Sequence, residues 1–231
     1  RRVKQRVETF GETAVQYVKD GNGDFQPVSY NEFWDSVQRV GTGFLELGVE
    51  RGEHVGIISD NRPEWLVVDM ALLSIGAVDV PRGSDAMAQE ISYILNHADC
   101  RLAIAENAAQ VRKILEHRDE MPKVERIVMF DYDEEAAASL KETGIEPMAY
   151  GDLRTRGSEA YDADPSHFET AFGEGKTDDL ATIIYTSGTT GEPKGAMLTH
   201  RAFLFQMDRV KDRLFLDETD IFLSVLPIWH S

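Results

Sequence analysis

The sequence has only one cysteine, Cys100, among its 231 residues. A lone cysteine cannot form an intrachain disulfide, which argues against a disulfide-stapled secreted domain and favours a reducing compartment. Long apolar runs are also missing. No segment approaches the roughly 18 apolar residues of a membrane-spanning helix, and the Arg-rich start lacks the apolar stretch of a signal peptide. These absences predict a cytoplasmic protein, either soluble or peripheral to a membrane.

Positive charge is scarce as well. The chain has 24 Lys and Arg against 41 Asp and Glu, which gives a formal net charge of -17. Nucleic-acid binding relies on clustered Lys and Arg that release counterions, so no nucleic-acid partner is expected. The basic residues Arg1, Arg2, Lys4 and Arg6 could attach weakly to an anionic membrane, but a solvated N-terminal helix is the favoured interpretation.

Apolar residues make up 42% of the chain, enough for a sizeable core. From residue 54 onward, short apolar runs alternate with segments of helical periodicity. The expected strands are 54–59, 77–81, 101–105 and 126–130, and the expected helices are 63–75, 87–96, one marked by Val111, Ile114 and Leu115, and 134–141. This rhythm predicts an α/β fold with a mostly parallel sheet flanked by helices.

The segments on either side of this α/β region have other patterns. Residues 14–28 predict a small hairpin around a Gly-rich turn, and a capping box of Ser29 and Glu32 predicts a helix that ends at Gly48. Residues 151–179 are polar and lack a sustained period, so we expect a connecting stretch with one short helix at most. Beyond it we expect strands at 180–185, 196–198 and 221–226 and a helix from Thr199 through Leu214.

One segment concentrates groups suited to phosphate: Tyr185-Thr186-Ser187-Gly188-Thr189-Thr190-Gly191-Glu192-Pro193-Lys194-Gly195. Its glycines let backbone N–H groups converge, while its hydroxyls and one ammonium are donors suited to oxyanions. It is not a Walker A loop, because it contains no Gly-Lys-Ser/Thr sequence and leads toward a strand rather than a helix. The composition therefore predicts a phosphate cradle of another kind.

This string resembles the signature of the adenylate-forming superfamily, which includes acyl-CoA synthetases, luciferases and peptide-synthetase adenylation domains. The resemblance implies that ATP binds here and that Mg²⁺ is positioned in part by Thr186. It also implies a catalytic role for Lys194. The residues implied to contact the β and γ phosphates of ATP are Ser187, Gly188, Thr189, Thr190, Gly191 and Lys194.

A second element, Leu226-Pro227-Ile228-Trp229-His230, resembles the segment in which these enzymes place an aromatic residue and a histidine beside the acyl carboxylate. The resemblance implies a catalytic and substrate-binding role for His230. A satisfied structural histidine is the alternative. Trp229 either lines the acyl pocket or belongs to ordinary core packing, and both readings stay open.

Two further strings, Asn61-Arg62-Pro63-Glu64-Trp65 and Val80-Pro81-Arg82-Gly83-Ser84-Asp85, resemble the long-chain fatty-acid CoA ligase and acyl-ACP synthetase branch. The expected reaction converts a fatty acid and ATP to acyl-AMP and pyrophosphate, then passes the acyl group to CoA or a carrier-protein thiol. Activation of another carboxylate and a noncatalytic nucleotide-binding module are the alternatives. Homo-oligomer formation and peripheral membrane association stay open.

The chain opens without Met and ends at Ser231, so we expect trimming at both ends. We assign residues 1–231 to part of a large N-terminal AMP-binding domain, with the C-terminal mobile domain absent. Its expected units are a hairpin and helix (1–50), an α/β unit (51–150), a connecting stretch (151–179) and a phosphate-loop unit (180–231). An isolated piece that lacks the remaining segments is expected to be inactive, because such a site depends on their mutual positioning.

Overall fold

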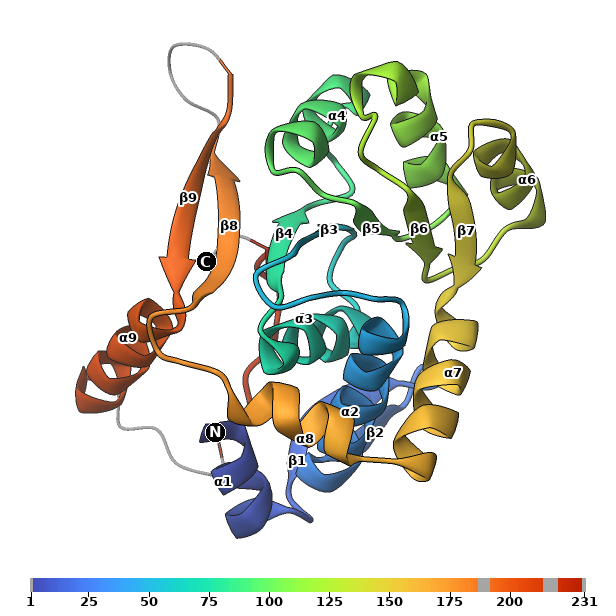
Figure 1. Ribbon diagram of the computed structural model, residues 1–231. Coiled ribbons are helices and arrows are strands. Elements are labelled where there is room, and N and C mark those ends of the chain that lie inside the picture. The colour runs from blue at the N-terminus through green and yellow to red at the C-terminus, as the bar shows by residue number, and fades with distance from the viewer. Residues whose placement is uncertain (1, 187–191, 214–219, 230–231) are drawn as a thin grey trace.

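Residues 2–186, 192–213 and 220–229, which the computed structural model describes, form a central sheet of seven strands. Neighbouring strands are parallel except for the last pair, which is antiparallel. In order across the sheet, the strands are β7 (Glu146–Ala149), β6 (Arg126–Met129), β5 (Leu102–Ala105), β3 (His54–Ile58), β4 (Val78–Arg82), β8 (Leu180–Thr186) and β9 (Lys194–Thr199) (Figure 1). The expected mostly parallel sheet is confirmed.

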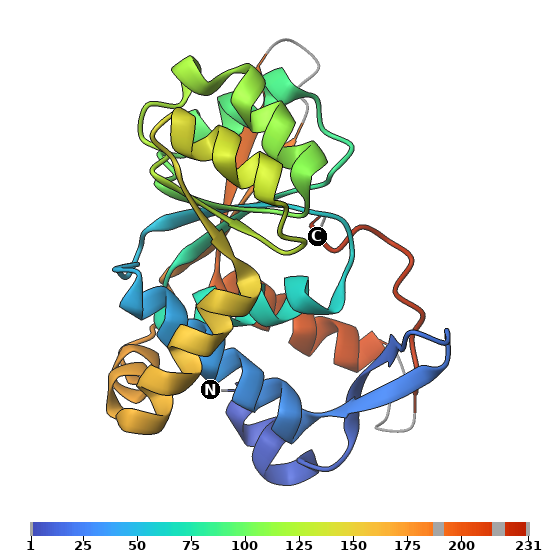
Figure 2. The same cartoon turned by 90° about the vertical axis from the view of Figure 1, so that its right-hand side faces the viewer.

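Helices cover both faces of the sheet (Figures 1 and 2). One face carries α4 (Ala88–His97), α5 (Ala108–Glu116) and α6 (Glu134–Glu142). The opposite face carries α2 (Tyr30–Glu46), α3 (Pro63–Ile75), α7 (Tyr150–Ala163) and α8 (Ser166–Gly173). Each layer closes its own apolar core against the sheet. Because its inner strands are buried on both sides, they read as continuous apolar runs in the sequence.

The N-terminal segment folds as expected. After α1 (Arg2–Phe10), strands β1 (Ala14–Lys19) and β2 (Phe25–Ser29) form an antiparallel hairpin. The Asp20 carboxylate accepts hydrogen bonds from the turn N–H groups of Asn22 and Asp24, at 2.8 and 3.0 Å. Ser29 and Glu32 then form the expected capping box of α2. In the described part of the chain, no helix combines the length and apolar character needed to cross a bilayer.

The expected helix 63–75 is confirmed at both ends. Pro63 occupies its first turn, where the missing N–H is not needed, and Gly76 ends it with φ +82°. The short strand β7 was not expected. It lies at the sheet edge, is only partly buried and contains Pro147, so it carries neither an apolar run nor clear alternation.

The expectation of a connecting stretch over 151–179 is wrong, because two helices, α7 and α8, occupy most of it. They dock through few apolar side chains, among them Leu153 and Phe168, which are fully buried. Gly157 allows a close approach to α2: a Cβ built on it would lie 2.0 Å from the carbonyl oxygen of Arg39. A helix that packs through small residues shows little apolar periodicity, which is why the sequence pattern missed it.

The expected strand at 221–226 is also wrong. In the structure, residues 220–226 form no helix or strand, and Ile221, Leu223 and Leu226 are each more than 70% exposed. The apolar composition alone suggested a strand. A strand also requires a neighbour that accepts its backbone hydrogen bonds, and the described residues provide none for this segment.

Asp79 is a buried acidic group and the second residue of β4. Its Oδ2 accepts a hydrogen bond from the Thr182 hydroxyl of β8 at 3.1 Å, whereas its Oδ1 has no partner within the described residues. Burial, and then the charge of Asp69 on α3, hold the pKa of Asp79 well above its ordinary value. Burial likewise raises the pKa of Asp69 to about 7. The pair therefore favours a protonated carboxyl beneath the β4–β8 junction.

This pair predicts a pH-dependent stability. Unfolded Asp carboxyls release their protons near pH 3.8, while the folded pair retains protons to about pH 7 or above. Between these pH values the folded state binds more protons than the unfolded state, so the free energy of unfolding falls as pH rises. Each proton that only the folded state holds lowers it by up to about 1.4 kcal/mol per pH unit. In Asp79→Asn, the thermal midpoint should fall less steeply with pH than in the wild type. In Asp119→Asn, a change at an exposed site, the wild-type dependence should be preserved. Parallel slopes for wild type and Asp79→Asn would contradict the assignment.

Candidate phosphate and carboxylate sites

The β8–β9 hairpin holds both ends of the predicted phosphate cradle. Thr186 ends β8, Lys194 begins β9, and the two are direct partners across the antiparallel ladder. Partners in such a ladder point to the same face, with Cβ atoms about 5 Å apart. Both residues are exposed. The two side chains therefore leave the ladder on the same face at the mouth of the loop. The loop itself lies outside the described residues, including the predicted phosphate contacts Ser187, Gly188, Thr189, Thr190 and Gly191.

The strand direction places the mouth of this loop on the side of the sheet where the parallel strands have their carboxyl ends. Because β8 runs parallel to β4, Thr186 lies beyond the carboxyl ends of the parallel strands. Ligands of open α/β sheets bind beyond these ends. The loops that follow β3 and β4 leave the sheet at this same edge, so residues far apart in the sequence are gathered there.

The segment before His230 is fixed at that edge by Asn61, which follows β3. The Asn61 amide donates from Nδ2 to the carbonyl oxygen of Leu226 at 2.8 Å, and its Oδ1 accepts from the N–H of Ile228 at 3.0 Å. One side chain thus satisfies two backbone groups of a strand-free segment. The sequence pointed to Asn61 only as the first residue of the string Asn61-Arg62-Pro63-Glu64-Trp65. An amide placed directly after a buried strand was the available signal for a site residue.

Trp229 lies against Gly83, which follows β4. A Cβ built on Gly83 would lie 2.4 Å from Cζ2 of the indole, so any side chain there would displace the ring. Trp229 is half-buried and packs on the core of the α2–α3 layer. Because the residue is only half-buried, both roles considered for it stay open. His230 lies outside the described residues, and its predicted role is untested.

Polar contacts fix the loops that carry Asn61 and Gly83. The N–H of Asp60 donates to the Glu106 carboxylate at 2.8 Å, and the Asp60 carboxylate accepts from the N–H of Ser84 at 3.3 Å. Lys113 on α5 donates to the carbonyl oxygens of Ser84 and Ala86, at 2.7 and 2.8 Å. The loops after β3, β4 and β5 are therefore tied to one another. These contacts also fix the position of Gly83, against which Trp229 packs.

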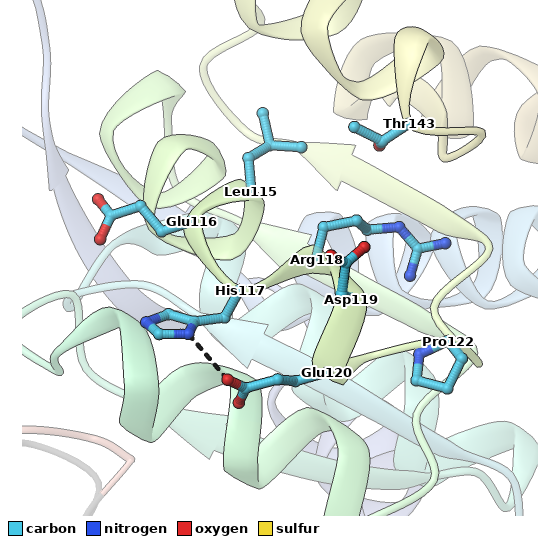
Figure 3. A pocket seen from close by; sticks show the side chains of 8 residues that line it. All are labelled: Leu115, Glu116, His117, Arg118, Asp119, Glu120, Pro122 and Thr143. Atoms are coloured by element: carbon cyan, nitrogen blue, oxygen red, sulfur yellow. Dashed lines mark hydrogen bonds and ion pairs between the residues drawn. The ribbon is translucent and has the colours of Figure 1, made fainter.

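A pocket of about 650 Å³ lies away from both sites, near the end of α5, η1 (Arg118–Glu120) and the end of α6 (Figure 3). In it, Nδ1 of His117 lies 3.0 Å from the Glu120 carboxylate. Its lining residues are Leu115, Glu116, His117, Arg118, Asp119, Glu120, Pro122 and Thr143. None belongs to the phosphate or carboxylate segments, so we assign this pocket no part in the chemistry.

The chain is similar in sequence to known proteins over most of its length. The chain is 34% identical over 209 residues to long chain acyl-CoA synthetase 6, peroxisomal, of Arabidopsis thaliana, covering 90% of this chain and 28% of that protein. It is 29% identical over 209 residues to the long-chain-fatty-acid–[acyl-carrier-protein] ligase AEE15, chloroplastic, of the same plant, covering 88% and 28%. The chain thus spans little more than a quarter of the length of these two relatives.

The fold has counterparts among solved structures. The o-succinylbenzoate CoA synthetase of Bacillus subtilis, solved with its acyl-adenylate intermediate, matches 99% of this chain and 50% of its own with a TM-score of 0.67. At 18% identity, this likeness shows the fold alone. The profile of the family described as AMP-binding enzyme matches residues 3–231, nearly the whole chain. The chain belongs to the AMP-binding enzyme family.

Proposed function

We propose that the protein containing this chain is an ATP-dependent acid–thiol ligase for long-chain fatty acids. In the first step, a carboxylate oxygen of the acid attacks the α-phosphorus of ATP, the bond to the β-phosphate oxygen breaks, and acyl-AMP and pyrophosphate form. In the second step, a thiol sulfur attacks the acyl carbon and AMP leaves. The observation that carries the proposal is the pairing of Thr186 with Lys194 at the mouth of the phosphate loop.

The charge that develops on departing pyrophosphate explains the residue types in this hairpin. An ammonium group such as that of Lys194 stabilises the leaving group without forming a covalent bond. The exposed Thr186 hydroxyl is an oxygen ligand of the kind Mg²⁺ accepts, so Thr186 is the residue we propose to hold that ion. Bound Mg²⁺ would neutralise phosphate charge. The donor set thus fits a magnesium–triphosphate complex.

The carboxylate is proposed to meet ATP beside Trp229 and His230, where Asn61 holds the preceding backbone and Gly83 leaves room for the indole ring. The names of the relatives support a long-chain acyl substrate and either CoA or an acyl carrier protein as the thiol. A cytoplasmic location, with or without peripheral attachment to a membrane, is part of the same proposal.

The direct test is fatty-acid-dependent exchange of labelled pyrophosphate into ATP by the full-length protein, over a panel of chain lengths and with aryl and amino acids as competitors. Exchange supported best by long-chain acids is expected. Exchange with another acid class alone would move the proposal to that class, and a folded protein that exchanges with no carboxylate would favour a noncatalytic module. The 231-residue chain, run alongside, is expected to show no exchange.

Asn61→Ala tests the placement of the carboxylate segment. The substitution removes two hydrogen bonds to the backbone, each contributing about 1 kcal/mol, so the KM for fatty acid should rise by about 10- to 30-fold. The KM for ATP should change little, because the phosphate hairpin is untouched. Asn96→Ala, at an exposed amide on α4, is the matched control. Equal KM values for fatty acid in Asn61→Ala and wild type would show that these two hydrogen bonds do not affect acyl binding.

A further inference from the structure

Tyr185 lies next to the mouth of the loop in the β8–β9 hairpin, which we call the phosphate hairpin. It directly precedes Thr186, and its partner across the ladder is Gly195, the neighbour of Lys194. A Cβ built on Gly195 would lie 3.1 Å from Cζ of Tyr185, so the ring covers the backbone of the opposite strand. The ring is buried on the face that carries α4. A shift of this ring would therefore shift both strands at the loop mouth.

His97, in the last turn of α4, holds the Tyr185 hydroxyl. Its Nδ1 lies 2.6 Å from the hydroxyl oxygen, a distance at which either group can donate depending on the imidazole tautomer. The two rings are perpendicular, with centroids 5.7 Å apart. Tyr93, one turn earlier on α4, stacks on His97 at 5.3 Å and meets Tyr185 edge-on at 6.4 Å. Three rings thus join the helix layer to the hairpin.

This contact matters because the strand pairing between the hairpin and the rest of the sheet lies upstream of the loop. The ladder between β4 and β8 registers at Asp79 and Thr182, upstream of the loop mouth. Beyond that point, β8 continues with β9 alone as its partner strand (Figure 1). Side-chain contacts therefore contribute to the orientation of its last residues relative to the sheet, and the His97–Tyr185 hydrogen bond is one such contact next to Thr186.

We infer that His97 is a positioning residue for the triphosphate, acting through Tyr185 on the placement of Thr186 and Lys194. The inference rests on the proposed function, since it assumes that these two residues face ATP. It assigns His97 no contact with substrate. Because the His97 ring is exposed, its removal opens no cavity in the core, so the structural effect of the substitution should stay local.

The test compares His97→Ala, His97→Asn and Tyr185→Phe in the full-length protein, with ATP binding measured directly and KM values taken from pyrophosphate exchange. His97→Ala and Tyr185→Phe should each weaken ATP binding by about three- to tenfold, the effect of one lost hydrogen bond, and leave the KM for fatty acid within about twofold. Asn can place a polar atom where Nδ1 lies, so His97→Asn should restore most of the ATP affinity. The double variant His97→Ala/Tyr185→Phe should weaken binding no further than either change alone.

The control is His117→Ala, which removes a partly exposed histidine that is paired with Glu120 and makes no hydrogen bond or ion pair with the hairpin among the described residues. Unchanged ATP binding in His97→Ala and Tyr185→Phe would overturn the inference. An equal rise of both KM values would also overturn it, because that result indicates general loosening. Failure of the proposed function has a different signature, namely a wild-type protein that binds ATP but shows no exchange. In that case the binding series still decides the role of His97, and a wild type that does not bind ATP overturns both.

Discussion

Replacing Lys194 by Ala in the full-length protein should lower the rate of acyl-adenylate formation by about 100- to 1,000-fold, the loss that follows removal of one donor that stabilises developing negative charge. Lys194 is exposed at the end of the hairpin and makes no ion pair within the described part of the chain. Its loss should therefore leave the thermal midpoint unchanged. The measurement is pyrophosphate exchange at saturating ATP together with thermal unfolding.

Two further variants make the Lys194 result specific. Lys194→Arg keeps the positive charge but changes its shape, so it should retain more activity than Lys194→Ala. Lys141→Ala removes an exposed lysine from the last turn of α6 and should have no effect on exchange. Wild-type turnover by Lys194→Ala would remove this residue from the proposed machinery, and a lowered thermal midpoint would instead indicate a structural role.

Replacing Gly157 by Ala should destabilise the protein by about 1–3 kcal/mol or more, the usual range for overpacking. A Cβ at this position would lie 2.0 Å from the carbonyl oxygen of Arg39 and 2.6 Å from the backbone nitrogen of Gly43, both on α2. Backbone atoms cannot rotate away, so α7 must move off α2. Thermal and urea unfolding of the full-length protein would measure the loss.

Gly151 supplies a matched control in the same helix, because a Cβ built there meets nothing within 4 Å. Gly151→Ala should be neutral or stabilising by up to about 1 kcal/mol, since alanine favours the helix and loses less backbone entropy on folding. Equal stability of the two variants would show that α7 adjusts its position without cost and that the close crossing is not required.

Glycine at position 157 illustrates what a single sequence conceals. In the sequence it stands among other glycines and polar residues, a pattern that favours a connecting stretch. In the structure it lies where two helices approach each other closely. Which meaning applies depends on the surface of α2, and that surface is not encoded in residues 151–179.

The candidate site divides in the same way. The string from Tyr185 to Gly195 predicted a phosphate cradle through its own glycines, hydroxyls and lysine, without knowledge of the rest of the fold. Asn61, by contrast, is separated from Leu226 by 165 positions, and their hydrogen bond gives no local signal. The seat of Trp229 on Gly83 and the contact of His97 with Tyr185 are likewise products of tertiary packing.

By itself, the sequence determined the alternation of strands and helices from 54 to 141 and the capping box at Ser29, and it predicted the chemistry of the phosphate segment. These features arise from interactions within one helix, strand or turn, where periodicity and backbone preferences act locally. Tertiary structure alone decided that α7 and α8 are helices against α2, that 221–226 pairs with no described strand, and which side chains hold the phosphate and carboxylate segments. The physical reason is that a close crossing, a paired strand or a long-range hydrogen bond requires a second surface, and that surface exists only once the chain has folded.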